Sequence, residues 1–348
     1  MRYFFFLPVF IICAAIASSP PLLVKVLQYG DGFYVGVTNA FFSEETEVTN
    51  LQSISFVGDV MLGRHVETLM KSKGEEYPYH NLVTLSSTTW FGNFEAASPR
   101  EHKQTPDFTF ALSVDAKYLP ALANFGFRHV GLANNHTFDF GADVFGQTQD
   151  NLRAEGIEPI GHPEHVSGDS VTYIQTQTGI VGVIAVHATQ ATPDFDSLKE
   201  QFDDMKRLSD VQLAFIHWGT EYEPIHSDLQ EKLAHELIDL GAEAVIGHHP
   251  HVVQDIGWYK DRPIFYSLGN FIFDQYFSEE VQQGLVVEVT IVDEGVEYAL
   301  QPVTSIDSVA APGLMDEKGE SAFMLSLAKR SAKEVQKGVI NEHIFGSR

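Results

Sequence analysis

Carboxylate, carboxamide and imidazole side chains gather in six short clusters along this sequence, each directly after an apolar run. Side chains of these types, without thiolates, suit Zn, Mn or Fe better than Ca or Mg. Two such metal ions, about 3.5–4 Å apart, can hold a phosphoryl group and activate a water molecule. The pattern therefore predicts one or two divalent metal ions and hydrolytic chemistry. The clusters are Gly58-Asp59, Asn93-Phe94-Glu95, Asn134-Asn135-His136, His217-Trp218-Gly219, Gly247-His248-His249-Pro250-His251 and Gly269-Asn270.

Each cluster taken alone has a simpler structural explanation. A Gly-Asp, Asn-Asn or Gly-Asn pair after a strand commonly forms a turn. A single histidine at a strand end, such as His217, is most often structural. Three histidines within four positions, His248, His249 and His251, are harder to explain in this way. The case for a site rests on all six clusters falling at the same end of successive strands.

The elements that must position these clusters are short apolar runs rich in Val, Ile and Phe. Continuous runs of this kind are typical of strands buried on both faces of a parallel sheet. Because ligands bind outside the carboxyl ends of strands in open α/β sheets, parallel neighbours would bring the clusters together. The runs are Ile54–Val57, Thr89–Gly92, His129–Leu132, Ile180–Val186, Val211–Ile216, Ala244–Ile246 and Ile264–Tyr266.

Helical patterns separate these runs. Ser227 and Gln230 form a capping-box pattern before a stripe of leucines, and Gly241 follows as a stop signal. Further helices are expected at 115–125, 143–155 and 319–336. A β-hairpin is expected from Leu285–Ile291 and Val296–Val303. Strands alternating with helices predict an α/β layered fold.

Composition restricts the class of partner. The chain has 348 residues, with 47 acidic and 22 basic side chains and a formal net charge of −25. Such a surface argues against nucleic acid, which requires clustered Lys and Arg, and against anionic lipid. With 44% hydrophobic residues the chain has the composition of a folded globular protein.

The first residues have the pattern of an export signal. Residues 1–17 combine Arg2, an apolar run from Phe4 to Ile16 and a small-x-small ending, which is typical of a secretory signal peptide. An uncleaved N-terminal anchor is the alternative, and it would be the chain's only contact with a membrane. We expect 18–51 to be a leader or linker with one strand or a hairpin around Leu22–Val37. The expected location is exported: periplasmic, cell-envelope or extracellular, in a bacterium.

Six strings in this order resemble the CapA family, the capsule or poly-γ-glutamate biosynthesis proteins. They are GDVMLGR (58–64), GNFE (92–95), LANNHTFDFG (132–141), HWGTEYE (217–223), GAEAVIGHHPHVVQ (241–254) and IFYSLGNFIFDQ (264–275). The resemblance spans 52–305 and leaves 306–348 as a C-terminal tail with a helix. That family is similar to calcineurin-like metallophosphatases. The resemblance implies a β-sandwich flanked by helices, with metal ions at the strand ends.

The resemblance also implies roles for individual residues. His136 would be the general acid for the leaving group. Asn93 or Glu95 would stand where the bridging carboxylate usually lies. The full set of implied metal ligands is Asp59, Asn93, Glu95, Asn135, His217, His249 and His251. The residues implied as substrate-binding or supporting groups are Arg64, Asp139, Glu221, His248 and Asn270.

Two positions depart from the metallophosphatase pattern. The histidine usually found two residues after the first aspartate is Met61 here, which cannot serve as an equivalent ligand. The second motif, usually Gly-Asp, is Gly92-Asn93, with Glu95 nearby. One metal site is therefore expected to be altered, weaker or absent.

Three functions remain open from the sequence. The first is metal-dependent hydrolysis of a phosphoester-type bond. The second is a non-catalytic subunit that binds an anionic envelope polymer or assists its synthesis or export, alongside envelope polymer-synthesis proteins. The third is hydrolysis of amide bonds in polyglutamate or cell-wall peptide. Because a body with a charge of −25 repels a polyanion, polymer binding would need bound metal ions together with Arg64.

Overall fold

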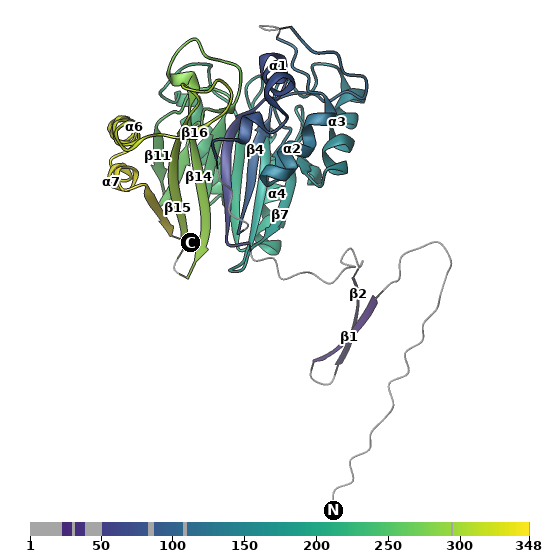
Figure 1. The fold of residues 1–348 in the computed structure, drawn as a ribbon. Helices are drawn as coiled ribbons and strands as arrows, with labels where there is room; N and C mark the ends of the chain where they lie inside the picture. Colours follow the sequence, from purple (N-terminus) through teal and green to yellow (C-terminus); the bar gives the residue numbers. More distant parts are fainter. Residues whose placement is uncertain are drawn as a thin grey trace, which may run out of the picture. The chain divides into compact units, whose positions relative to one another are not determined.

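The computed structural model describes residues 23–29, 32–38, 51–82, 87–106, 110–293 and 295–347, in two separate units. The first, within Met1–Val48, holds an antiparallel hairpin of β1 (Leu23–Tyr29) and β2 (Gly32–Thr38), where the sequence predicts one strand or a hairpin (Figure 1). The second unit is Thr49–Arg348 and contains every predicted site residue. The predicted signal segment 1–17 lies outside the described residues.

A nine-stranded sheet forms one layer of the second unit. Its order is β16-β15-β14-β3-β4-β5-β6, with β13 beside β3 and β17 beside β15. Strands β3 to β6 run parallel, whereas β14 joins β3 antiparallel. The strands are β3 (Ser53–Val60), β4 (Thr88–Phe94), β5 (Phe127–Gly131), β6 (Glu158–Ile160), β13 (Asn270–Ile272), β14 (Gln283–Val292), β15 (Gly295–Thr304), β16 (Gly313–Leu314) and β17 (His343–Ser347).

A six-stranded sheet forms the second layer, in the order β11-β12-β10-β9-β8-β7. Its four central strands, β12, β10, β9 and β8, are parallel, and each edge strand is antiparallel to its neighbour. The strands are β7 (Val171–Gln175), β8 (Ile180–His187), β9 (Val211–His217), β10 (Ala244–His248), β11 (Ile256–Tyr259) and β12 (Arg262–Phe265).

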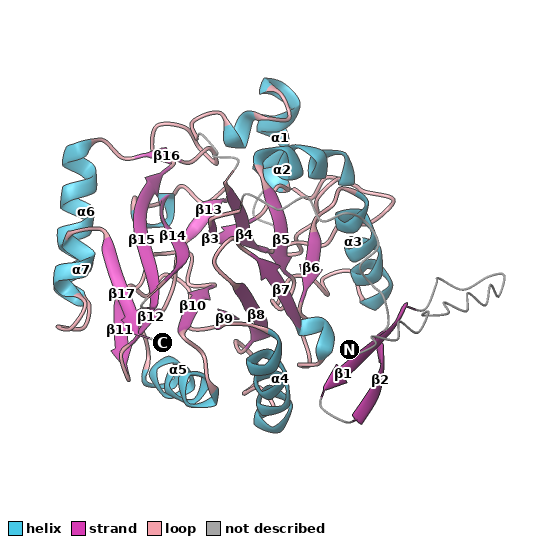
Figure 2. Cartoon of the chain, turned by 90° about the horizontal axis from the view of Figure 1, so that it is seen from below, coloured by secondary structure: helices cyan, strands magenta, loops and turns pink. Residues whose placement is uncertain are grey.

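The two sheets share one apolar core, in which Phe56 and Phe91 of the larger sheet meet Phe215 of the smaller one. Helices α1 to α3 pack on the outer face of the larger sheet, and α4 and α5 on that of the smaller sheet (Figure 2). This helix-covered β-sandwich is the layered α/β fold that the sequence predicts. The helices are α1 (Arg64–Lys73), α2 (Leu119–Phe125), α3 (Ala142–Ala154), α4 (Phe195–Leu208), α5 (Asp228–Leu240), α6 (Glu317–Arg330) and α7 (Gln336–Ile340).

Most expected elements form, and one boundary is wrong. The predicted capping box of α5 is present, with Ser227 and Gln230 each bonding the other's backbone N–H. The expected helix over 319–336 ends instead at Arg330. The cause is Ser331, whose hydroxyl donates to Leu327 O and accepts from Ile256 N, so that the chain turns toward β11. Among the described residues no helix has the length and apolarity needed to span a membrane.

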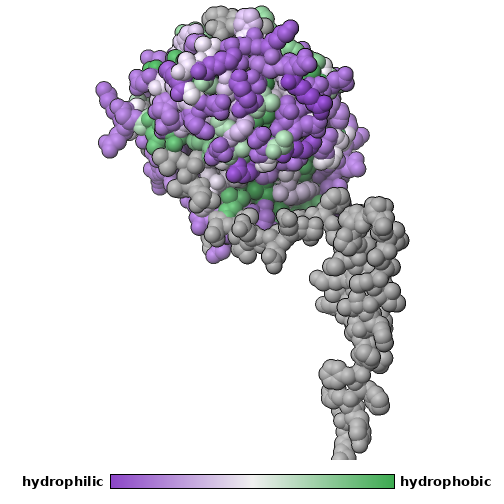
Figure 3. All heavy atoms as spheres, turned by 45° about the vertical axis from the view of Figure 1, so that its right-hand side comes forward, coloured by the Kyte–Doolittle hydropathy of each residue, from purple (hydrophilic) through white to green (hydrophobic). Residues whose placement is uncertain are grey.

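Much of the face drawn in Figure 3 is hydrophilic, as the −25 charge implies.

A short segment of the chain crosses from the smaller sheet to the larger one. After β12 the chain leaves the smaller sheet, and β13 pairs with β3 of the larger one, placing Asn270 beside Asp59. The crossing requires close backbone approach, because a Cβ on Gly58 would lie 1.8 Å from Gly269 O.

Gly58→Ala should therefore destabilise the protein strongly. The methyl group would collide with backbone that cannot move without separating the sheets, so we expect a loss of about 2–4 kcal/mol in unfolding free energy. The matched control is Gly146→Ala in α3, where nothing lies within 4 Å of the added Cβ. There a helical Ala should be neutral or add up to about 1 kcal/mol. Urea unfolding of both variants tests this; equal stabilities would contradict it.

Candidate metal centre

The carboxyl ends of four parallel strands from two sheets meet at one place. Asp59 lies on β3, Asn93 on β4, His217 on β9 and His248 on β10. None of these side chains is more than 2% exposed. Because buried polar groups are stable only with partners, these side chains must satisfy one another or a bound ligand.

Asn93 connects the two sheets at this point. Its Nδ2 atom donates to Asp59 Oδ1 at 2.8 Å and Glu95 Oε2 at 3.2 Å, and lies 3.3 Å from His217 Nδ1. Its Oδ1 accepts from Asn134 Nδ2 at 2.9 Å. A carboxylate here would add a third acidic group to the buried centre, whereas the carboxamide donates to the carboxyl groups of both Asp59 and Glu95. This explains how the departure at Asn93 is accommodated.

Asp59, His217 and His248 form the first group of side chains that could hold a metal ion, with ligand atoms within 4.8 Å of one another. His217 Nε2 lies 2.7 Å from Asn135 Oδ1, which favours a proton on that nitrogen. The lone pair on His217 Nδ1 then faces the centre, 2.9 Å from His248 Nδ1.

Glu95, His249 and His251 form the second group, again within 4.8 Å. His251 Nδ1 lies 3.1 Å from Asp59 Oδ2 and 2.9 Å from Asn270 Oδ1, so it carries the proton. Its Nε2 lone pair therefore faces Glu95 Oε1 at 3.8 Å. Glu95 Oε1 and His249 Nδ1 are buried without a hydrogen-bond partner.

These observations test whether the residues fit divalent metal ions. Two buried carboxylates, imidazole nitrogens with inward lone pairs and two orphaned ligand atoms form a nitrogen and oxygen donor set that suits such ions. The backbone also supports the geometry, since His249 and His251 have φ of 99° and 59°. Strained residues of this kind persist only where the surroundings hold them. The donor set fits divalent metal ions.

The pKa values of the two carboxyl groups diverge. Burial acts to raise the pKa of Asp59, but the hydrogen bond from His251 and the nearby imidazoles outweigh burial and lower it to about 2. Burial and the neighbouring Asp59 charge raise the pKa of Glu95 well above its usual value. A metal ion bound at Glu95 would therefore displace a proton.

Burial also sets the direction of the pKa shifts of three histidines. It lowers the pKa of His248 and of His249 to about 3, and that of His217 well below its usual value, with neighbouring imidazoles adding to the effect. Neutral imidazole is the form that binds metals. These three rings are therefore in the ligand state at neutral pH.

His136 lies at the edge of the centre. Its Nδ1 is 2.8 Å from Asp139 Oδ2, an oxygen that also accepts from Leu112 N at 2.7 Å. Its Nε2 faces Glu95 Oε1 at 3.7 Å. Asp139 thus orients the ring so that Nε2 faces the centre.

A cavity of about 390 Å³ opens next to His136 and His251. Arg64 and Glu221 both line it, as expected of substrate-binding groups. Arg64 is held by Asp274 through its Nε and Nη2 atoms, so its charge is already balanced. The structure thus brings together the predicted metal, acid and supporting residues at one place; their roles remain predictions.

The sequence analysis missed several features of the site. Asn134 is buried and braces Asn93, and its Oδ1 accepts from His136 N at 3.0 Å; only its position beside Asn135 hinted at this. Tyr276 and Phe277, which the sequence analysis did not single out, are 44% and 64% exposed and line the cavity. Met61 is buried, with its sulfur accepting from Gly63 N, and joins neither ligand group.

A third group of side chains that could hold a metal ion, Glu67, His102 and Asp115, belongs to α1 and the segments before α2. Glu67 is already paired with His102 at 2.9 Å and with Lys71 at 2.7 Å. Asp115 is paired with Lys117. These pairs balance the buried carboxylate, so we assign no metal to the group.

Fold and site together define a class: a helix-covered β-sandwich with a buried histidine and carboxylate centre at the strand ends. The model of the family described as bacterial capsule synthesis protein PGA_cap matches residues 53–275. The chain belongs to this family.

Two curated relatives agree. Capsule biosynthesis protein CapA of Bacillus anthracis is 32% identical over an alignment of 257 positions that covers 67% of this chain and 62% of that protein. PGA biosynthesis protein CapA of Bacillus subtilis is 27% identical over an alignment of 307 positions that covers 82% of this chain and 80% of that protein. This chain thus spans less than two thirds of the length of the B. anthracis relative.

Among solved structures, a phosphatase from Mycoplasma pneumoniae is similar to this chain at a TM-score of 0.43 and 15% identity. The match covers 72% of this chain and 86% of that one.

The metal-free protein should lose stability on acidification below pH 6.5. Unfolded histidines gain protons near pH 6.5, whereas folded His217, His248 and His249 resist protonation, so the unfolded state binds more protons as pH falls. Glu95 opposes this, since its raised folded pKa makes the folded state bind the extra proton above pH 4.5. The three histidines outweigh Glu95, so the unfolding free energy should fall by about 2 kcal/mol between pH 6.5 and 5.5.

Urea unfolding in the presence of a chelator at both pH values measures this difference. A flat profile, or a gain in stability at the lower pH, would contradict the assignment of neutral buried imidazoles.

Proposed function

We propose that this chain is an exported bacterial protein of envelope-polymer synthesis that hydrolyses a phosphoester-type bond with one or two bound Mn, Fe or Zn ions. The observation that carries the proposal is the pair of buried ligand groups at one junction of strand ends, with two ligand atoms left without partners. A buried orphaned carboxylate oxygen is costly unless something binds it.

Divalent ions held there would polarise a phosphoryl oxygen and lower the pKa of a water molecule. The protein's own residues supply the rest. Asp59 and Glu95, with His217, His249 and His251, would hold the ions. Asn93 and Asn270 fix the orientation of their carboxylate and imidazole neighbours. His136, oriented by Asp139, would give its Nε2 proton to the leaving oxygen.

The polymer itself is proposed from the relatives, one of which is described as a PGA biosynthesis protein. A chain of −25 charge would approach an anionic polymer only through a local positive centre. Because Asp274 already balances Arg64, bound metal ions are the main source of positive charge in this proposal. Envelope polymer-synthesis proteins are the proposed partners.

A second candidate is a non-catalytic, polymer-binding or export subunit with the same metal ions. Met61 and Asn93 favour it, because each stands where a metallophosphatase usually supplies a ligand. In this case the metal ions would bind polymer carboxylates and no bond would break. Both candidates predict bound metal ions, whereas only the first predicts phosphoester turnover.

Elemental analysis of the purified full chain should find one or two equivalents of Mn, Fe or Zn. The double variant Asp59→Ala, His249→Ala should lose them, because it removes a ligand from each group. The control is Asp203→Ala, His343→Ala, which removes the same residue types from exposed ion pairs and should retain the metal. No bound metal after reconstitution of the folded wild type would overturn the proposal.

His136→Ala should lower phosphoester turnover by about a hundredfold or more while leaving metal content intact, as expected for loss of a general acid. The loss should be larger for an alkyl phosphate than for p-nitrophenyl phosphate, whose leaving group needs less protonation. Asp139→Asn should give a smaller loss of turnover, since Asp139 would affect the reaction only by orienting the His136 ring. A loaded protein that turns over neither ester would favour the polymer-binding subunit.

A further inference from the structure

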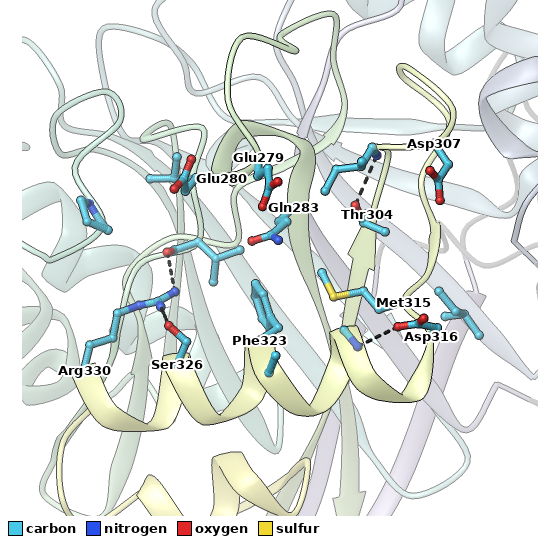
Figure 4. Close-up of a pocket in the computed structure, with 17 residues that line it drawn as sticks. Glu279, Glu280, Gln283, Thr304, Asp307, Met315, Asp316, Phe323, Ser326 and Arg330 are labelled. Carbon is cyan, nitrogen blue, oxygen red and sulfur yellow. Dashed lines mark hydrogen bonds between the residues drawn. The ribbon is translucent and has the colours of Figure 1, made fainter.

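A second and larger cavity, of about 880 Å³, lies away from the residues of the proposed reaction. Helix α6 forms one side, and the Glu279–Gln283 segment forms the opposite side (Figure 4). Phe323 projects from α6 into the space between them (Figure 4). Val252 and Val253, which directly follow His251, supply further apolar wall.

The lining combines exposed apolar side chains with negative charge. Ile306 and Leu314 are 42% and 58% exposed at its edge, although both are large hydrophobic residues. Four carboxylates line the cavity: Glu279, Glu280, Asp307 and Asp316. All four are exposed to solvent.

A single basic side chain, Arg330, is found among the cavity's described lining residues. It lies at the end opposite Asp307 and Asp316 (Figure 4). Its Nη2 donates to Val253 O at 3.0 Å and its Nη1 to Ser326 Oγ at 3.3 Å. These bonds hold the guanidinium at that end of the cavity, away from Asp307 and Asp316.

We propose that this cavity, between α6 and the Glu279–Gln283 segment, is a docking site for a segment of a partner protein that presents lysine or arginine beside leucine-like side chains. The apolar wall would bury the aliphatic groups, and the four carboxylates would meet the cations. The volume suits a few side chains, as expected for a short peptide segment.

Charge selects this occupant over a second copy of the chain. With a net charge of −25, two copies repel each other, and the acidic cavity would meet another acidic surface. The chain's own first 48 residues contain only two basic residues, Arg2 and Lys25, so they offer little charge complementarity. A basic segment of another protein fits both the charge and the apolar wall.

The probes are fluorescent 12-residue peptides in which Leu and Lys recur at spacings of two, three or four, read by anisotropy at 150 mM salt on the full chain. Matched peptides replace Leu by Ser or Lys by Glu. We expect at least one Leu/Lys peptide to bind and both replacements to weaken binding. Binding by Ser/Lys peptides as tight as by Leu/Lys peptides, or no binding by any of them, would overturn the proposal.

Variants separate the cavity from general attraction to an acidic protein. Glu279→Lys with Asp307→Lys should weaken peptide binding at least about tenfold, since like charges would then face each other. Glu155→Lys with Glu200→Lys changes the net charge equally at two exposed positions, one directly after α3 and one within α4, and should leave binding within about twofold. Equal losses in both variants would overturn the proposal.

Two further measurements complete the test. Ile306→Ser with Leu314→Ser should weaken binding while unfolding remains unchanged, because both side chains are largely exposed. Sedimentation of the wild type should show a monomer; a dimer abolished by the cavity variants would identify a second copy as the occupant and overturn the proposal. Metal content should be unaffected in all these variants, so this test and that of the proposed function can fail independently.

Discussion

The hydrogen bonds of one carboxamide make the rest of this site feasible. Asn93 stands between Asp59 and Glu95, two carboxyl groups with no solvent exposure, and its Nδ2 donates to both. Two neighbouring buried carboxyl groups cannot both ionise without compensating interactions. The Asn93 amide lowers the free-energy cost of a negative charge here, and the imidazoles from the opposite sheet favour placing that charge on Asp59. Asn93, one of the two positions that depart from the metallophosphatase pattern, thus contacts side chains of both sheets.

The same junction explains how much could be predicted from sequence. Parallel strands of one sheet end at a common edge, so the clusters after β3 and β4, and those after β9 and β10, were expected to meet in pairs. That the two pairs face each other follows from the packing of the two sheets. The capping box of α5 was equally readable, because its signal lies within four residues. Local patterns therefore carried both the fold class and most of the site.

What escaped prediction depends on contacts distant in sequence. Strand β13 is only three residues long, and nothing near Asn270 indicates pairing with β3. Helix α4 is an exception, because its signal is local and was overlooked: Asp194 caps it, and its buried residues Leu198, Phe202 and Met205 recur at helical spacing. Asn134 resembles a turn residue until Asn93 and Phe94 are seen to accept its two amide hydrogens. The exposure of Tyr276 and Phe277 likewise follows from how their loop borders the cavity.

The crossing from β12 to β13 has a consequence for how the chain is assembled. Strand β3 is central in its sheet, yet β13 and β14, which flank it on one side, arrive about 210 residues later, since Asn270 follows Val60 by 270 − 60 = 210 positions. A ribosome delivers the chain from its N-terminus, so one side of β3 stays unpaired during most of synthesis. Contacts this distant in sequence form slowly, and open strand sides invite aggregation. The pairing of Asn270 with Asp59 therefore has a cost during synthesis. The nascent chain must be kept from contact with other unfolded chains until its last third has emerged.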